Sequence, residues 1–278
     1  MKRTILTGLL AIGAGATCLM AQAPPPATAA APGPMPVAKV PKAQSKSELD
    51  AVRALYAAAG DPDKAIAAAE ALITKYADTE FKRAALDMEA DAYQKKGDFN
   101  KMEICADRVL EINPQDWQAL LMLAEYYATH TRENDLDREE KLGKVEKYAS
   151  LLAEVMKTEP KPTAQVTDEQ WATIRKDTAA EGYNAIGLAN MTRKKYDAAA
   201  ASFRTALDTV AGPEPAYMVR LALALQNAGK NEEAIAWCDK ALAVPNVHPQ
   251  VKDYAQKIRA MAVKAAAPKA PAAPPPAK

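Results

Sequence analysis

The sequence has few of the residues that enzymes commonly use for chemistry. Only two histidines and three cysteines occur in 278 residues, and none of them has a partner at the spacing of a metal site. His130 and His248 each stand beside an expected turn, as surface histidines do. The sequence also has no glycine-rich phosphate loop, no Gly-x-Ser-x-Gly elbow and no His-Glu-x-x-His helix. We therefore expect a protein that is not an enzyme and holds no metal and no cofactor.

Aromatic residues are also scarce, at 6% of the chain. No stretch alternates apolar and polar residues for long, which argues against a sheet. Alanine is abundant instead, and small side chains suit close packing of one helix on another. The sequence therefore predicts an all-α fold in one elongated domain.

Neither sign of charge dominates. Without residues 1–23, which contain Lys2 and Arg3, the chain has 34 basic side chains (36 minus 2) against 35 acidic ones. A nearly neutral body gives no electrostatic reason to bind nucleic acid. We therefore expect no nucleic-acid partner.

Both ends of the chain have the composition of segments outside a folded core. Residues 1–23 carry two basic residues, an apolar run and Ala21-Gln22-Ala23, which fits the cleavage site of a secretory signal. Pro24 would follow the cut and hinder it, so a retained N-terminal membrane anchor is the alternative. Residues 24–45 and 265–278 are rich in alanine and proline, as spacers are. We expect a periplasmic or secreted protein of bacterial origin.

A pattern typical of two consecutive helices occurs twice in residues 180–248, with the second copy 35 residues after the first. The first copy contains Tyr183, Ile186, Gly187, Ala199, Phe203 and Ala206. The second contains Met218, Leu221, Ala222, Ala234, Cys238 and Ala241. Small residues at fixed offsets from large apolar ones, at this period, resemble the tetratricopeptide repeat (TPR) family.

The resemblance implies a right-handed α-solenoid of about five helix–turn–helix units and a C-terminal capping helix. The units would span about 46–79, 83–116, 117–160, 180–213 and 215–248, with the capping helix at 250–264, so that the solenoid domain covers 46–264. Gly229 and Asp61-Pro62 mark expected turns. Cys105 and Cys238 fall in second helices three units apart, which predicts two buried free thiols and no disulfide.

The third unit is irregular. Thr129 to Glu140 is longer than a repeat turn and rich in acids, yet it lacks the turn glycine and distal glutamate of a calcium loop. We interpret it as the salt-bridged start of a helix, with a contact device as the alternative. Thr167 and Gln170 form a possible capping box, so the helix that carries Trp171 should continue into the fourth unit.

By the same resemblance, first-helix residues that do not pack on neighbouring units would form a concave groove for a partner. These residues are Asp87, Asp91, Gln94, Leu121, Glu125, Asn184, Leu188, Met191, Val219, Leu223 and Gln226, with Asp50, Ala54 and Ala128 beside them. Such a groove would be acidic toward its N-terminal half and apolar toward its C-terminal half. It would suit a protein segment with a basic part and an apolar part. The alternative is that the acids only keep the surface soluble and the apolar residues pack inside.

These observations predict an exported scaffold that binds another protein in the cell envelope. One alternative is a structural assembly factor of an envelope machine for outer-membrane protein insertion, pilus assembly or polysaccharide export. Another is binding of cell-wall polymers through the lysine-bearing tails. Membrane contact is expected only if the N-terminal segment is retained.

Overall fold

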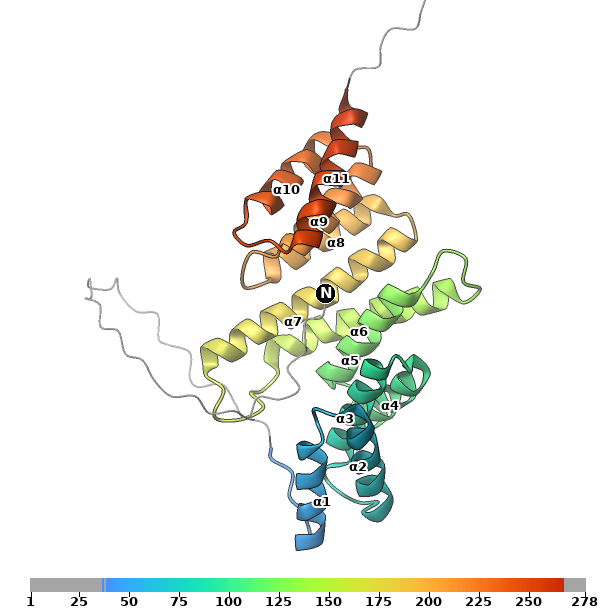
Figure 1. Cartoon of the computed structure of the whole chain (residues 1–278), viewed down its shortest axis with the longest axis vertical. Coiled ribbons are helices and arrows are strands. Elements are labelled where there is room, and N and C mark those ends of the chain that lie inside the picture. The colour runs from blue at the N-terminus through green and yellow to red at the C-terminus, as the bar shows by residue number, and fades with distance from the viewer. Residues whose placement is uncertain (1–36, 38, 268–278) are drawn as a thin grey trace, which may run out of the picture. The chain divides into compact units, whose positions relative to one another are not determined.

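The computed structural model describes residue 37 and residues 39–267, and these residues contain eleven α-helices (Figure 1). The predicted signal peptide and most of both predicted tails lie outside the described residues. Contacts divide the chain into two compact units. Unit 1 comprises the described residues up to 114 together with 160–168, and unit 2 comprises 115–159 and 169–267. The single solenoid domain predicted over 46–264 stays a prediction.

Unit 1 contains α1 (Lys46–Ala57), α2 (Pro62–Lys75), α3 (Lys82–Lys96) and α4 (Phe99–Ile112), each packed on the next. Its helices begin where the sequence supplies caps. The Ser45 side chain caps α1, and Asp61 caps α2, with Pro62 in its first turn. The core of the unit includes Leu72 and Phe81. An isolated parallel bridge joins Val37 to Lys161.

Unit 2 contains α5 (Trp117–His130), α6 (Arg138–Thr158), α7 (Asp168–Thr192, which begins at the last residue of unit 1), α8 (Tyr196–Thr209), α9 (Pro215–Asn227), α10 (Asn231–Ala243) and α11 (Pro249–Ala266). Helix α9 packs on α8, α10 and α11, and α5 packs on α6. Helix α7 is one helix of 25 residues, as the sequence predicts. The buried Trp171 ring lies edge-on to Trp117, with centroids 6.2 Å apart, and its Nε1–H donates to the Glu159 carbonyl at 2.8 Å.

Small residues permit close helix contacts in unit 2. An added Cβ at Gly187 of α7 would lie 2.6 Å from Cδ1 of Phe203 on α8. Phe203 is fully buried in a core cluster with Leu221 and Leu225. Gly187 therefore has its predicted role as a small residue where two helices meet, and the side chain that it leaves room for is Phe203.

The two cysteines within residues 39–267 are both buried and free. Burial is the main cause that raises the thiol pKa, to about 12 for Cys105 and about 11 for Cys238. These thiols act as small apolar side chains in the core. No helix within residues 39–267 is long and apolar enough to cross a membrane.

Candidate functional site

The first helices of the repeats in unit 2 bring three polar side chains together. These are Glu125 on α5, Asn184 on α7 and Arg220 on α9. Asn184 Oδ1 accepts a hydrogen bond of 2.6 Å from Nη1 of Arg220. The Tyr217 ring, one turn earlier on α9, has its centroid 6.0 Å from the guanidinium carbon of Arg220. We call Glu125, Asn184 and Arg220 the polar centre.

Burial sets the electrostatics of this centre. Burial lowers the pKa of the Arg220 guanidinium from its ordinary value, although Tyr217, Glu214 and Glu125 all oppose that shift. Burial also raises the pKa of Glu125, and Arg220 opposes it. Each charge is thus partly desolvated and partly stabilised by the other. Both side chains are nevertheless half-exposed, so that a ligand can reach them.

The polar centre offers donors and an acceptor at one place. A guanidinium has five N–H donors, and the Asn184 bond uses one of those on Arg220. Glu125 supplies carboxylate oxygens that accept. Donors and acceptors of these kinds can form hydrogen bonds with the backbone groups of another chain. Within the described residues, no three His, Cys, Asp or Glu side chains lie together as a metal site would require.

The predicted groove residues of unit 2 divide into buried and half-exposed sets. Leu121, Asn184 and Val219 are buried, at 2%, 7% and 5% exposure. The expectation that they avoid packing on neighbours is therefore wrong, because neighbouring helices cover these positions. The half-exposed set is Glu125, Leu188, Met191, Leu223 and Gln226.

The apolar half of the predicted groove has a structural role. Leu188 and Met191 pack against the cluster that contains Phe203, and Leu223 packs against the one that contains Val251. These side chains bury part of their surface in the core of unit 2. Their remaining exposed surface is what a partner can use.

The acidic residues predicted for the groove belong to both units. Asp87, Asp91 and Gln94 lie on α3 in unit 1 and are half-exposed. Asp87 Oδ2 lies 3.0 Å from Nη1 of Arg83, and Asp91 pairs with Lys95. Cations of the same helix therefore already neutralise both carboxylates, which weakens their attraction for a basic segment.

Sequence reasoning missed Arg220. The repeat pattern assigns the inward face of α9 to Val219, Leu223 and Gln226, and Arg220 lies about 100° around the helix from Val219. The available signal is that Arg220 is an arginine within the apolar run from Tyr217 to Leu225, and a charge in such a run needs a buried partner.

Comparisons with known proteins agree with this architecture. A sequence profile described as a tetratricopeptide repeat matches residues 176–247, and a second one, with the same description, matches residues 84–116. The chain is a tetratricopeptide repeat protein. The helix pairs of both units are those of an all-α TPR solenoid.

Several solved structures are similar to this TPR protein. A thermophilic TPR protein of Thermus thermophilus is 21% identical, with a TM-score of 0.48, and the match covers 76% of this chain and 98% of that one. The MamA protein is 17% identical, with a TM-score of 0.46 and coverages of 66% and 88%. A TPR protein from Parabacteroides merdae is 12% identical, with a TM-score of 0.34 and coverages of 79% and 100%. No curated protein sequence matches the chain significantly.

Proposed function

We propose that this TPR protein is an exported scaffold whose polar centre binds an extended segment of another protein in the cell envelope. The TPR fold itself supports a role in protein–protein interaction. The observation that carries the finer proposal is the position of Arg220 on the first helix α9, where its Nη1 donates to Asn184 at 2.6 Å while the side chain stays half-exposed. The charge of Glu125 on α5 also acts on it. Desolvated charges that a partner can reach bind polar groups more strongly than charges in open water.

The proposed segment binds through its backbone and a few side chains. Its carbonyl groups accept from Arg220 and its N–H groups donate to Glu125, while apolar side chains cover the exposed parts of Leu188, Met191 and Leu223. Asp87 and Asp91 of unit 1 already pair with Arg83 and Lys95 and are not part of this proposed site. Export itself rests on the signal-like residues 1–23.

Photocrosslinking in cells tests this proposal. A photoreactive residue replaces Asn227, which is exposed and lies two turns along the same face of α9 as Arg220. The matched control replaces Ala201, which is exposed on the second helix α8. We expect one envelope protein to be captured from position 227 and not from 201. Equal capture from both positions would refute a binding site on the first helices.

Substitutions in the polar centre then measure its contribution to binding. We expect Arg220→Gln to weaken the captured complex by about 2 kcal/mol, or ~30-fold, because it removes charged hydrogen-bond donors and the positive charge that acts on the partly desolvated Glu125. Arg220→Gln combined with Glu125→Gln should restore part of that loss. Lys240→Ala on α10 should leave the affinity unchanged. Unfolding of each variant, followed by tryptophan fluorescence, separates lost binding from lost folding.

A further inference from the structure

Helices α9 and α11 each pack on the helix pair that precedes them in the chain (Figure 1). Each begins at a proline, and these prolines, Pro215 and Pro249, are 34 residues apart. Three buried positions recur at that offset, as Tyr217, Leu221 and Ala224 in α9 and as Val251, Ala255 and Ile258 in α11. Two outward positions of α9, Arg220 and Asn227, therefore correspond to Tyr254 and Met261 of α11.

Tyr254 and Met261 are large, mainly apolar side chains on one exposed edge of α11. They are 54% and 48% exposed, and their spacing of seven residues places them two turns apart on the same edge. The side of α11 toward a following helix is different. Gln256 lies at the position of Ala222, which packs on Cys238 of α10. That side is polar, as the end of a repeat stack requires, so the exposed apolar edge is not explained by a missing repeat.

The exposed edge of α11 continues the line of the polar centre. Arg220 lies between α7 and α9, where it bonds Asn184, and Tyr254 has the equivalent position between α9 and α11. Leu223 of α9 is half-exposed and packs against the cluster that contains Val251 of α11. Packed helices lie about 8–10 Å apart, and an extended chain advances about 3.3 Å per residue. A segment bound at Arg220 therefore reaches Tyr254 about three residues further along.

We propose that Leu223, Tyr254 and Met261 form an apolar subsite of the same groove. It binds a large apolar side chain of the partner segment, about three residues from the residue that contacts Arg220. This inference rests on the proposed function, because its occupant is the segment bound at the polar centre. A tyrosine ring and a thioether both pack well on aromatic and aliphatic side chains.

The charges around the subsite favour this occupant. Lys257 lies between Tyr254 and Met261 along α11, and its Nζ is 2.8 Å from Asp253, so the ammonium group already has a counter-charge. A second copy of this chain is a poor occupant. Four basic side chains of α11 stand against the single acidic Asp253, and two such helices would repel each other: Lys252, Lys257, Arg259 and Lys264.

Photocrosslinking of the full chain in its native cells tests the shared segment. A photoreactive residue replaces Met261 in one protein and Asn227 in another. The matched control is Val263, which is 45% exposed on the same helix but lies about 160° around it from Met261. We expect the same protein to be captured from 227 and 261 and not from 263. The two crosslinked sites in that protein should lie about three residues apart.

Affinities of the purified partner then test the subsite itself. Tyr254→Ala should weaken binding roughly 10- to 30-fold, because it removes the ring on which the apolar side chain packs. Val263→Ala should bind as the wild type does. Alanine at the partner's crosslinked apolar residue should weaken binding to the wild type, but much less to Tyr254→Ala, since the two side chains contact each other. Tryptophan fluorescence confirms that each variant is folded.

Each outcome decides the proposal. Shared capture at 227 and 261, together with coupled losses for Tyr254 and the partner's residue, supports it. Capture at 227 alone, equal capture at 261 and 263, or unchanged affinity of Tyr254→Ala removes the subsite and leaves the groove function standing. Capture from 261 of a second copy, or of residues 268–278 of the same chain, also overturns it. Loss with Tyr254→Ala but not with Arg220→Gln overturns the polar centre and, with it, the shared segment; no capture at either position refutes both.

Discussion

Replacing Gly187 by alanine should destabilise unit 2, although the same change stabilises most helices. The new Cβ would lie 2.6 Å from Cδ1 and 2.8 Å from Cζ of Phe203. Ordinary carbon contacts begin near 3.5 Å, so the ring or the helix must move by about 1 Å. Phe203 is fully buried among well-packed neighbours. The displacement therefore spreads into the core rather than into solvent.

The expected magnitude follows from two opposing effects. Alanine gains about 1 kcal/mol over glycine in a helix interior. Overpacking a filled core costs about 1–3 kcal/mol, and here the whole ring is in conflict, which puts the cost at the upper end. We expect Gly187→Ala to lower the free energy of unfolding by about 1–2 kcal/mol. Gly143→Ala on α6 is the matched control, because its Cβ would meet no atom within 4 Å. It should raise the free energy of unfolding by about 0.5–1 kcal/mol.

Urea unfolding measured by tryptophan fluorescence suits this comparison. All three tryptophans, Trp117, Trp171 and Trp237, belong to unit 2, so the signal reports that unit. Combining Gly187→Ala with Phe203→Leu should recover part of the loss, since the smaller side chain makes room; the two effects should not add. A Gly187→Ala protein as stable as the wild type would show that this helix contact is not close, and would refute the reasoning.

Three further predictions concern thiols, a buried acid and a turn. With Cys18→Ser, native protein at pH 8 should react slowly with a thiol reagent, because burial holds the pKa of Cys105 and Cys238 near 12 and 11; rapid labelling without urea would contradict this. Burial is the main cause that raises the pKa of Glu89, and the charge of Glu70 is the second. The ionised side chain is therefore disfavoured in the folded state, so unit 1 is most stable below about pH 4.5 and loses this stability as the pH rises. Glu89→Gln should therefore stabilise unit 1 against urea at pH 7 and not at pH 4, and equal effects at both pH values would count against it. Lys194 has a φ of +60°, which glycine adopts without strain, so Lys194→Gly should raise the stability of unit 2 by up to about 1 kcal/mol. Lower stability would show that the ion pair of Lys194 with Glu133 outweighs this strain.

The features that could be predicted from sequence are those fixed by local chemistry. Asp61 and Pro62 start α2 because a carboxylate cap and a fixed proline φ suit a first turn. Gly229 ends the turn after α9 because it tolerates positive φ. The length of α7 followed from uninterrupted helical residues on both sides of Trp171. Each of these depends only on residues within a turn or two of one another.

The polar centre depends on residues far apart in the chain, and the sequence did not reveal it. Arg220 meets Asn184, 36 residues earlier, and Glu125 on a third helix. A repeat pattern states which face of a helix turns inward, but not how deeply a long side chain is covered. Leu121 and Val219 were misplaced for the same reason, since the packing of adjacent first helices decides whether an inward position is groove or core.

Lys194, which has a φ of +60°, is an intermediate case, because the sequence itself indicates that this position is unusual. It stands 35 residues before Gly229, the spacing of the two repeat copies, so the alignment of the copies places a lysine where a glycine is expected. Its significance required the structure, which shows Glu133 opposite it. Departures from glycine at this position are therefore worth examining in other repeat proteins.

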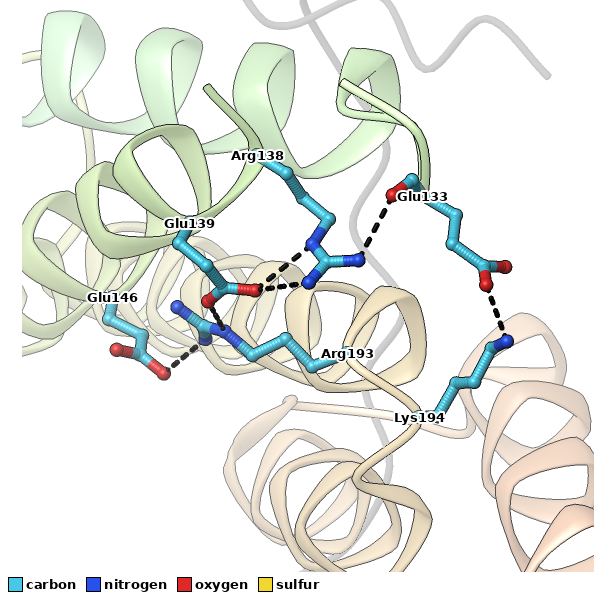
Figure 2. Close-up of polar contacts among 6 residues, drawn as sticks. All are labelled: Glu133, Arg138, Glu139, Glu146, Arg193 and Lys194. Atoms are coloured by element: carbon cyan, nitrogen blue, oxygen red, sulfur yellow. Dashed lines mark hydrogen bonds and ion pairs between the residues drawn. The ribbon is translucent and has the colours of Figure 1, made fainter. Parts of the chain in front are cut away.

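The ion pairs that Arg193 and Lys194 form with residues 133–146 contribute little to folding stability (Figure 2). Lys194 and Glu133 are 59% and 56% exposed in their side chains, and exposed pairs contribute about 0–1 kcal/mol. The unfavourable backbone of Lys194 costs about as much, so this pair adds little net stability. Arg193 is better buried, at 9% side-chain exposure, but its two carboxylates are half-exposed. The stability of unit 2 therefore depends little on this network, which is why Lys194→Gly is not expected to destabilise it.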